Sequence, residues 1–297
     1  MTAIVHDSRE QLSTRLLKAA AKNSYDPTVD IDWAAELSQD KAFMPYLRVS
    51  LYGTQLWDEM SEDQRRELSK QELASIAGTG LWFEMILIQM LTRWAYHQDP
   101  QAPHTQFALT EIGDETRHII MFAKAISRLG APTYRPPAPI HHLARVYKAL
   151  AKGVTVFAPV LVAEEMTDRL QRSIMNDEDV EPLVRMVNRI HVVEESRHVR
   201  FARDEVARQM PRLGPLSTVV ASTISALVSA FVAGSLINPD VYVQVGLDKR
   251  RAIREARNNP YNHETKRWMA EKIMAFLGEQ GLLTWSARPI YKFAHLI

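Results

Sequence analysis

A chain of 297 residues can form one large domain or two small ones, and it is long enough to bury a core without disulfides. Hydrophobic residues make up 46% and charged residues 24%, and the net charge of +1 gives no reason to expect nucleic acid or an anionic membrane as a partner. Cysteine is absent, so any metal site must use His, Asp and Glu. The first residues contain no apolar stretch of signal-peptide length, which predicts a cytoplasmic location.

The pattern predicts helix nearly throughout, because no run of β-branched residues alternates with polar ones as a half-buried strand would. An N-terminal helix is expected from about Ser8 to Ala21, followed by short helical pieces up to Asp58. Ser61, with acidic residues directly after it, is typical of a helix N-cap. The long helix that it begins should run to about Gln98.

A turn at residues 99–103 separates this helix from a second one that ends near Gly130, whose position fits a C-terminal cap. Residues 131–139 contain four prolines and are interpreted as an extended crossover inside one domain. A third helix is expected over residues 158–176, with Pro159 near its first position. Pro182 is similarly placed at the start of the fourth helix, which runs to about Met210.

The segment between Arg212 and Asp240 contains no charged residue and is long enough to span a bilayer. Seven of its residues are Ser or Thr, and no other segment resembles it, so we favour a helix that is fully buried in the core. A membrane or dimer contact is the alternative. An amphipathic helix over residues 263–277 follows. We therefore predict one all-α domain over residues 1–297, with core helices at about 62–211 and the terminal helices packed around them.

Two short sequences repeat in the core region: DETRH at 114–118 and EESRH at 194–198. Each places a Glu three residues before a His, so both side chains project from one helix face and can reach one metal ion. The pairs are Glu115 with His118 and Glu195 with His198. One such pair is usually an ordinary solvated pair. Two copies flanked by apolar residues indicate a metal site, because buried carboxylates are costly unless they are paired or metal-bound.

The helix before each motif offers one more carboxylate at the same distance. Glu84 lies 31 residues before Glu115, and Glu164 lies 31 residues before Glu195. The midpoints fall in or at the edge of two predicted turns, residues 99–103 and the polar NDED sequence at 176–179. In antiparallel hairpins the ligands therefore lie level, about 23 Å from each turn at 1.5 Å per residue. This offset favours Glu164 over its neighbour Glu165. Two hairpins that face each other across a pseudo-twofold axis would bring six ligands together.

This ligand set predicts a ferritin-like four-helix bundle that holds two metal ions, for which a Glu from two helices and Glu-x-x-His from the other two are typical. Carboxylate and imidazole ligands suit iron or manganese. Asp114 and Glu194 precede the ligands and are expected to accept the second ring N–H of the opposing histidines. His191 lies four residues before Glu195 on the same face, where a third imidazole would make the site asymmetric.

The arrangement of Glu84, DETRH, Glu164 and HVVEESRH resembles the p-aminobenzoate N-oxygenase family of ferritin-like di-iron enzymes over about residues 71–208. The extra histidine one turn before the second Glu-x-x-His, here His191, distinguishes that family. The resemblance implies two iron ions and a homodimer. It also implies dioxygen as a co-substrate and oxidation of an aryl amine nitrogen. The implied ligands are Glu84, Glu115, His118, Glu164, His191, Glu195 and His198.

We therefore expect a di-iron oxygenase of a small organic substrate, with an aryl amine favoured and no catalytic residues beyond the metal ligands. No flavin or nicotinamide fingerprint is visible, so an external electron donor is expected. One alternative is a di-iron hydroxylase or desaturase that acts on carbon, with the apolar helix at Leu216–Ile237 lining a channel. Another is iron storage, ferroxidase or manganese catalase activity. His191 favours the N-oxygenase over both.

Overall fold

The computed structural model describes residues 8–136 and 138–297, and in this part of the chain helices account for all the regular secondary structure apart from one isolated β-bridge. The all-α, ferritin-like prediction is confirmed. In chain order the elements are α1 (Arg9–Lys22), η1 (Tyr46–Arg48), α2 (Gln55–Glu59), α3 (Glu62–Ala95), α4 (Pro103–Arg128), α5 (Ala138–Leu150), α6 (Val154–Met175), α7 (Pro182–Gln209), η2 (Met210–Arg212), α8 (Pro215–Ser235), α9 (Asp240–Gln244), α10 (Lys249–Asn258), α11 (Pro260–Glu279) and α12 (Arg288–Phe293).

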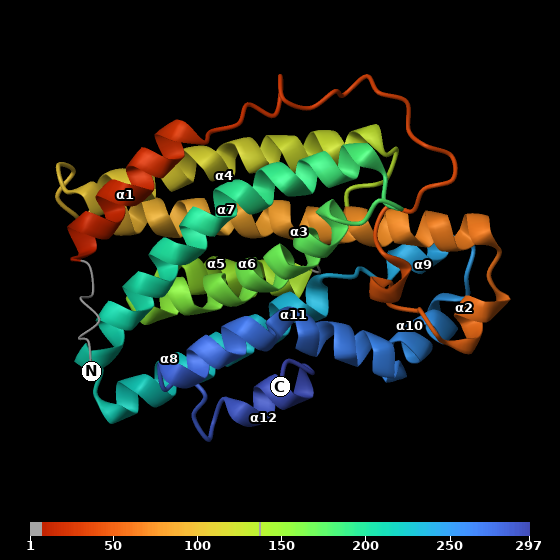
Figure 1. Cartoon of the computed structure of the whole chain (residues 1–297). Helices are drawn as coiled ribbons and strands as arrows, with labels where there is room; N and C mark the ends of the chain where they lie inside the picture. Colours follow the sequence, from red (N-terminus) through yellow and green to blue (C-terminus); the bar gives the residue numbers. More distant parts are fainter. Residues whose placement is uncertain (1–7, 137) are drawn as a thin grey trace, which may run out of the picture.

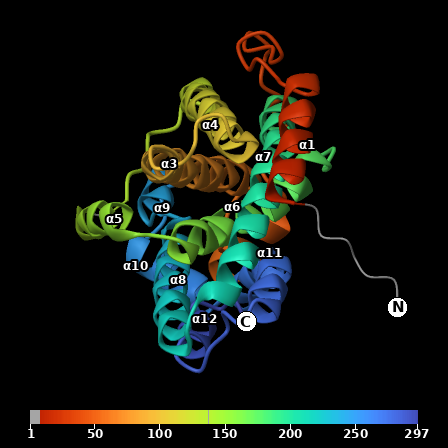
Figure 2. The same ribbon diagram turned by 90° about the vertical axis from the view of Figure 1, so that its left-hand side faces the viewer.

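Two helical hairpins form the bundle (Figure 1): α3 pairs with α4, and α6 pairs with α7. Their ends follow the sequence signals closely. Ser61 caps α3 through a capping box with Gln64, and Gly130 follows the end of α4 with a positive φ of 64°. Pro182 is the first residue of α7, where its missing N–H costs no helical hydrogen bond. The terminal helices pack around this bundle (Figure 2): α1 lies against α4 and α7, and α11 and α8 lie against α6. These contacts support our proposal that residues 1–297 form one domain.

The crossover between the hairpins passes close to α3 at Gly78. A Cβ atom at this position would lie 2.9 Å from the carbonyl oxygen of Tyr134, so only glycine lets the crossover approach the helix this closely. Tyr134 also donates a 2.5 Å hydrogen bond to the amide oxygen of Gln71 on α3. The crossover therefore rests on the surface of the first hairpin before α5 begins.

The third long helix begins earlier than the sequence predicted. α6 starts at Val154, so Pro159 lies inside the helix and not near its first position. Proline cannot donate to the carbonyl four residues earlier, which belongs to Thr155. That carbonyl accepts a 2.5 Å hydrogen bond from the Tyr147 hydroxyl of α5 instead. A partner from another helix thus replaces the helical hydrogen bond that Pro159 cannot donate.

The apolar segment forms α8, but the prediction of a fully buried helix was wrong for one face. Residues with small side chains, Ala and Ser, predominate on its buried face. On this face Ser222 donates a 2.5 Å hydrogen bond to the Leu282 carbonyl. Large side chains such as Leu216 (78% exposed) and Leu227 (47%) lie on the opposite side. Both α3 and residues 215–244 are long and apolar enough to cross a membrane by length and composition, a test that core helices also pass.

Candidate metal centre

The motif residues meet in the interior of the bundle, halfway along the two hairpins. α3 and α6 each contribute one Glu, and α4 and α7 contribute the Glu-x-x-His pairs. No side chain of this set is more than 6% exposed. The structure brings together Glu84, Glu115, His118, Glu164, His191, Glu195 and His198. Their ligand atoms form overlapping groups of three in which all atoms lie within 4.8 Å of one another.

Glu115 occupies the middle of the cluster. One of its carboxylate oxygens lies 2.9 Å from Nδ1 of His118, and the other lies 2.9 Å from Nδ1 of His198. The carboxylate of Glu195 lies 3.0 Å from the same His198 nitrogen. A carboxylate whose two oxygens face two different imidazoles has the geometry required to bridge two cations.

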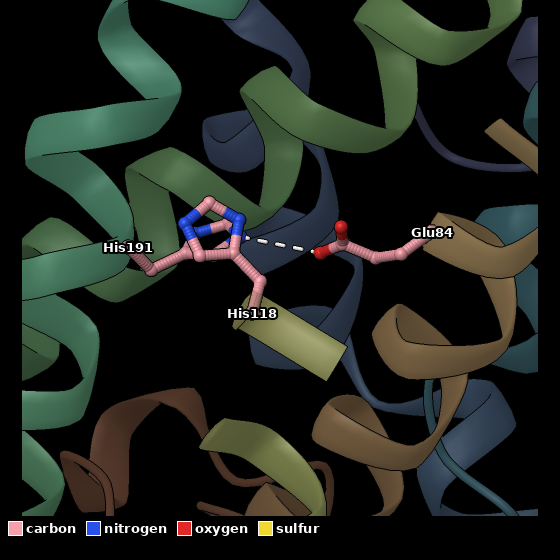
Figure 3. Close-up of side chains that lie close together, drawn as sticks. All are labelled: Glu84, His118 and His191. Carbon is pink, nitrogen blue, oxygen red and sulfur yellow. Dashed lines mark hydrogen bonds and ion pairs between the residues drawn. The ribbon is translucent and has the colours of Figure 1, made fainter. Parts of the chain in front are cut away.

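His191 joins the cluster from one turn earlier on α7. Figure 3 shows its ring beside that of His118, with Glu84 of α3 pointing toward both. The two ring centres lie 4.5 Å apart, and His191 Nε2 lies 3.3 Å from Glu84 Oε1. On its other side, His191 Nδ1 lies 2.8 Å from the amide oxygen of Gln171 on α6. This contact fixes the proton on Nδ1 and leaves the Nε2 lone pair directed into the cluster.

The acidic residues that precede the two motifs contact the opposing histidines. His118 Nε2 lies 2.9 Å from Glu194, and His198 Nε2 lies 3.2 Å from Asp114. Each Nε2–H therefore donates to a carboxylate, which leaves Nδ1 facing the centre. Arg117 pairs with Asp114, and Arg197 lies 3.4 Å from the same carboxylate. These arginines offset the negative charge behind the histidines.

The neighbours Glu164 and Glu165 point in different directions. Glu164 lies in the cluster with His191 and Glu195. Glu165 faces α7, where its carboxylate accepts two hydrogen bonds from Arg203, at 2.6 and 2.5 Å. Successive helical residues are about 100° apart, so only one of the two can face the centre.

Burial and close neighbours shift the pKa values of the clustered carboxylates and histidines in opposite directions. Burial raises the pKa of Glu84 and of Glu164 well above the ordinary value, and repulsion from Glu115 and Glu195 adds to it. Burial also opposes ionisation of Glu115, but hydrogen bonds from Glu84 and the charge of His198 outweigh it and lower that pKa. Burial would lower the pKa of His118, yet Glu115 and Glu194 raise it to about 9.

The donor set fits two metal ions. Glu84 Oε2 and Glu195 Oε1 are buried without a hydrogen-bond partner among the described residues. Such atoms carry a desolvation cost that a bound cation would remove. Oxygen and imidazole donors without thiolate suit iron or manganese.

A family model described as p-aminobenzoate N-oxygenase AurF matches residues 6–281. The chain belongs to this family. An uncharacterized protein of Mycobacterium bovis is 23% identical over 97% of this chain and 87% of its own length. An uncharacterized protein of Mycobacterium tuberculosis (strain CDC 1551 / Oshkosh) is 28% identical over 69% of this chain and 62% of its own length. The AurF family is a family of oxygenases, which use dioxygen and a small-molecule substrate.

Sequence reasoning missed two residues of this AurF-family site. Gln171 orients His191, and Glu111 lies within 4.8 Å of the ligand atoms of Glu115 and His198. A signal for Glu111 was present, because every ligand of the first hairpin lies 80 positions before its counterpart in the second. The same offset connects Glu111 with His191. No such signal exists for Gln171, whose counterpart is Leu91.

A cavity of about 60 Å³ opens beside the cluster, between the bundle and α8. Glu84, Glu164 and His191 are its titratable lining residues, beside the uncharged polar residues Thr79, Thr167, Gln171 and Asn188. The rest is mainly apolar and includes Phe83, Phe122, Ile126, Val187, Val232 and Leu236. Among the described residues, no Lys or Arg lines it. Glu111 and His198 do not line it either, so the cavity reaches the cluster from the side of His191.

Proposed function

We propose that this AurF-family protein binds two iron ions through the seven predicted ligands and uses them to oxygenate a small aryl amine at nitrogen. The central observation is Glu115, whose two oxygens each lie 2.9 Å from Nδ1 of a different histidine. One carboxylate between two imidazoles, with further carboxylates from α3 and α6, is the arrangement that two adjacent cations require. His191 supplies the additional imidazole that accompanies this family's ligand pattern.

Two ferrous ions at this site would supply the electrons that dioxygen needs before it can attack an organic substrate. The protein's own contribution is positioning and exclusion of water. Glu194 and Asp114 hold the two motif histidines with Nδ1 directed inward, and Gln171 holds His191 with Nε2 directed inward. Burial of every ligand to 6% exposure or less keeps bulk water from the reactive centre.

The cavity favours an aryl amine that carries no negative charge. Phe83 and Phe122 offer apolar surface for an aromatic ring. With the amino group toward the cluster, a substrate carboxylate would lie at the other end of the cavity, among mainly apolar side chains and, within the described residues, no lysine or arginine. Desolvating an anion there without a cation would be costly. The amino group of the substrate would instead face the polar end of the cavity, beside His191.

A second candidate is oxidation at carbon, as in a hydroxylase or desaturase. Val232 of α8 and Leu236, which follows the end of that helix, line the cavity. The hydroxylase or desaturase alternative expected this apolar segment to line a channel. A wholly apolar substrate would suit these contacts as well as an amine does. For either reaction we propose an external electron donor and, from the family resemblance, a homodimer.

Single-turnover oxygenation separates these candidates. Protein loaded anaerobically with Fe(II) is mixed with oxygen and an equimolar panel of aniline, p-aminobenzoate and ethylbenzene, and products are quantified by mass spectrometry. We expect N-oxygenated aniline in at least tenfold excess over N-oxygenated p-aminobenzoate. Oxidation of ethylbenzene alone would establish carbon chemistry. No product from any substrate, with iron bound, would contradict the oxygenase proposal.

A further inference from the structure

The two hairpins of the bundle carry the same three ligands of the Glu and Glu-x-x-His pattern at equivalent positions, and they differ one turn before the Glu-x-x-His pair. Glu84 and Glu164, Glu115 and Glu195, and His118 and His198 are each 80 positions apart. One turn before the Glu-x-x-His pair, the second hairpin has His191 and the first has Glu111. Both Glu and His are metal ligands, so the difference replaces one donor by another and does not remove it.

The position of Glu111 allows its carboxylate to act as a metal ligand. It lies on α4, four residues before Glu115 and thus on the same helix face. Its side chain is 3% exposed, and Oε2 has no hydrogen-bond partner among the described residues. A carboxylate oxygen of Glu111 lies within 4.8 Å of donor atoms of both Glu115 and His198.

Glu111 and His191 each reach the opposite hairpin. His191 of the second hairpin groups with Glu84 and His118 of the first. Glu111 of the first hairpin groups with His198 of the second, and its charge also acts on Glu164. The two residues therefore approach different ends of the cluster, one on each side of Glu115.

A buried glutamate with a purely structural role looks different in this protein. Glu72 of α3 is fully buried, and its two oxygens accept hydrogen bonds from the backbone and side chain of Ser50. Glu111 Oε2 has no such bond, and its carboxylate is buried near Glu115 and His198, whose charges act on it in opposite directions. A carboxylate in that position is stabilised by a cation and destabilised by its absence.

We propose that Glu111 is an eighth ligand, which binds the metal ion held by His198 at the end of the cluster away from the cavity. This inference rests on the proposed function, because it requires the two-ion site. It makes the centre unequal: the ion near the cavity is bound by two imidazoles, and the other ion by one imidazole and an additional carboxylate.

Cobalt(II) titration of metal-free protein, followed by absorption spectroscopy and equilibrium dialysis, tests this assignment. Wild-type protein should bind two ions. Glu111→Gln should retain one ion and bind the second at least tenfold more weakly. Glu111→His should bind two ions again, with a shifted ligand-field spectrum because nitrogen replaces oxygen. Glu72→Gln, the matched control, should bind two ions with the wild-type spectrum.

The outcomes separate the two proposals. Wild-type protein that binds no ion would overturn the two-ion site and the proposed function with it. Two ions in wild type, together with wild-type affinity in Glu111→Gln, would overturn only the role of Glu111. Circular dichroism identifies a variant that has lost its fold. If Glu111→Gln is unfolded, Glu111→His decides: an unchanged cobalt spectrum would show that residue 111 does not touch the metal.

Discussion

The α3–α4 and α6–α7 hairpins place the same ligands at the same spacing, yet their surroundings differ. In the second hairpin Gln171 holds His191 by a 2.8 Å contact, and the cavity reaches both residues. In the first hairpin the equivalent positions are Leu91 and Glu111, and neither lines the cavity. In the proposed two-ion centre, repetition of the ligands provides the two cation positions, and the difference one turn away determines which of them faces the cavity.

The largest effect on metal binding is expected for Glu115, whose carboxylate faces a histidine of each hairpin. Glu115→Ala removes the carboxylate that faces both motif histidines, so both ions should be lost. The iron content measured after iron loading should fall from two ions per chain to nearly none. Unchanged occupancy would show that the metals, if bound, lie elsewhere. Far-ultraviolet circular dichroism checks that the variant remains helical.

His191→Ala should separate oxygenation from metal holding. Six of the seven predicted ligands remain, and six suffice for two ions in this architecture. The variant should keep most of its iron but lose more than tenfold in single-turnover product, because the missing imidazole belongs to the ion beside the cavity. Wild-type yield from this variant would make His191 an ordinary core residue.

Adjacent glutamates of α6 provide a matched pair. Glu164→Ala should weaken binding of one ion by at least tenfold, because Glu164 lies in the cluster. Glu165→Ala should keep both ions and lower the free energy of unfolding by about 2 kcal/mol, since it leaves Arg203 without its buried partner. Isothermal titration and urea unfolding measure the two quantities. Iron loss from Glu165→Ala alone would reverse the ligand assignment.

Metal affinity should rise with pH. In the metal-free protein Glu115 and Glu194 raise the pKa of His118 to about 9, although burial opposes this, so His118 is protonated below that pH. A metal ion must displace the Nδ1 proton. Between pH 6 and 9, each proton displaced should increase the apparent affinity about tenfold per pH unit. Titration with manganese(II) at several pH values measures this slope, and a flat profile would contradict the assigned protonation.

Gln171→Leu gives the second hairpin the residue type that the first hairpin has at the equivalent position, Leu91. His191 would lose the acceptor that fixes its ring, and such supporting contacts typically contribute about tenfold or more to metal affinity. We expect a loss of about tenfold for one ion, with the other unaffected. Cobalt titration against wild type gives the comparison. Equal affinities would show that packing alone orients His191.

The parts of the site that could be predicted are those that follow from helical periodicity. Glu115 and His118 share a face because they are three residues apart, and the 31-residue offset places Glu84 and Glu164 level with them. Gln171 could not be found in this way, because its role depends on the rotation of α6 against α7. Two sequence signals pointed to Glu111: it lies four residues before Glu115 on the same helix face, and 80 residues before His191.

The errors in the fold have the same origin. The sequence placed Pro159 near the start of its helix and could not show the Tyr147 hydroxyl, which comes from another element and satisfies the carbonyl that an internal proline leaves free. Lack of charge in α8 indicated burial on all sides, but composition cannot tell which face packs. The small Ala and Ser residues, not the large ones, form the buried face, because they allow close approach to neighbouring helices.

Iron stoichiometry tests the central claim most directly. Metal-free wild-type protein is equilibrated with excess Fe(II) under anaerobic conditions, dialysed, and analysed for iron and protein. The arrangement around Glu115 predicts two iron ions per chain, in two distinct environments by Mössbauer spectroscopy because His191 and Glu111 differ. One ion per chain, or none, would contradict the two-ion centre on which the proposed oxygenase function rests.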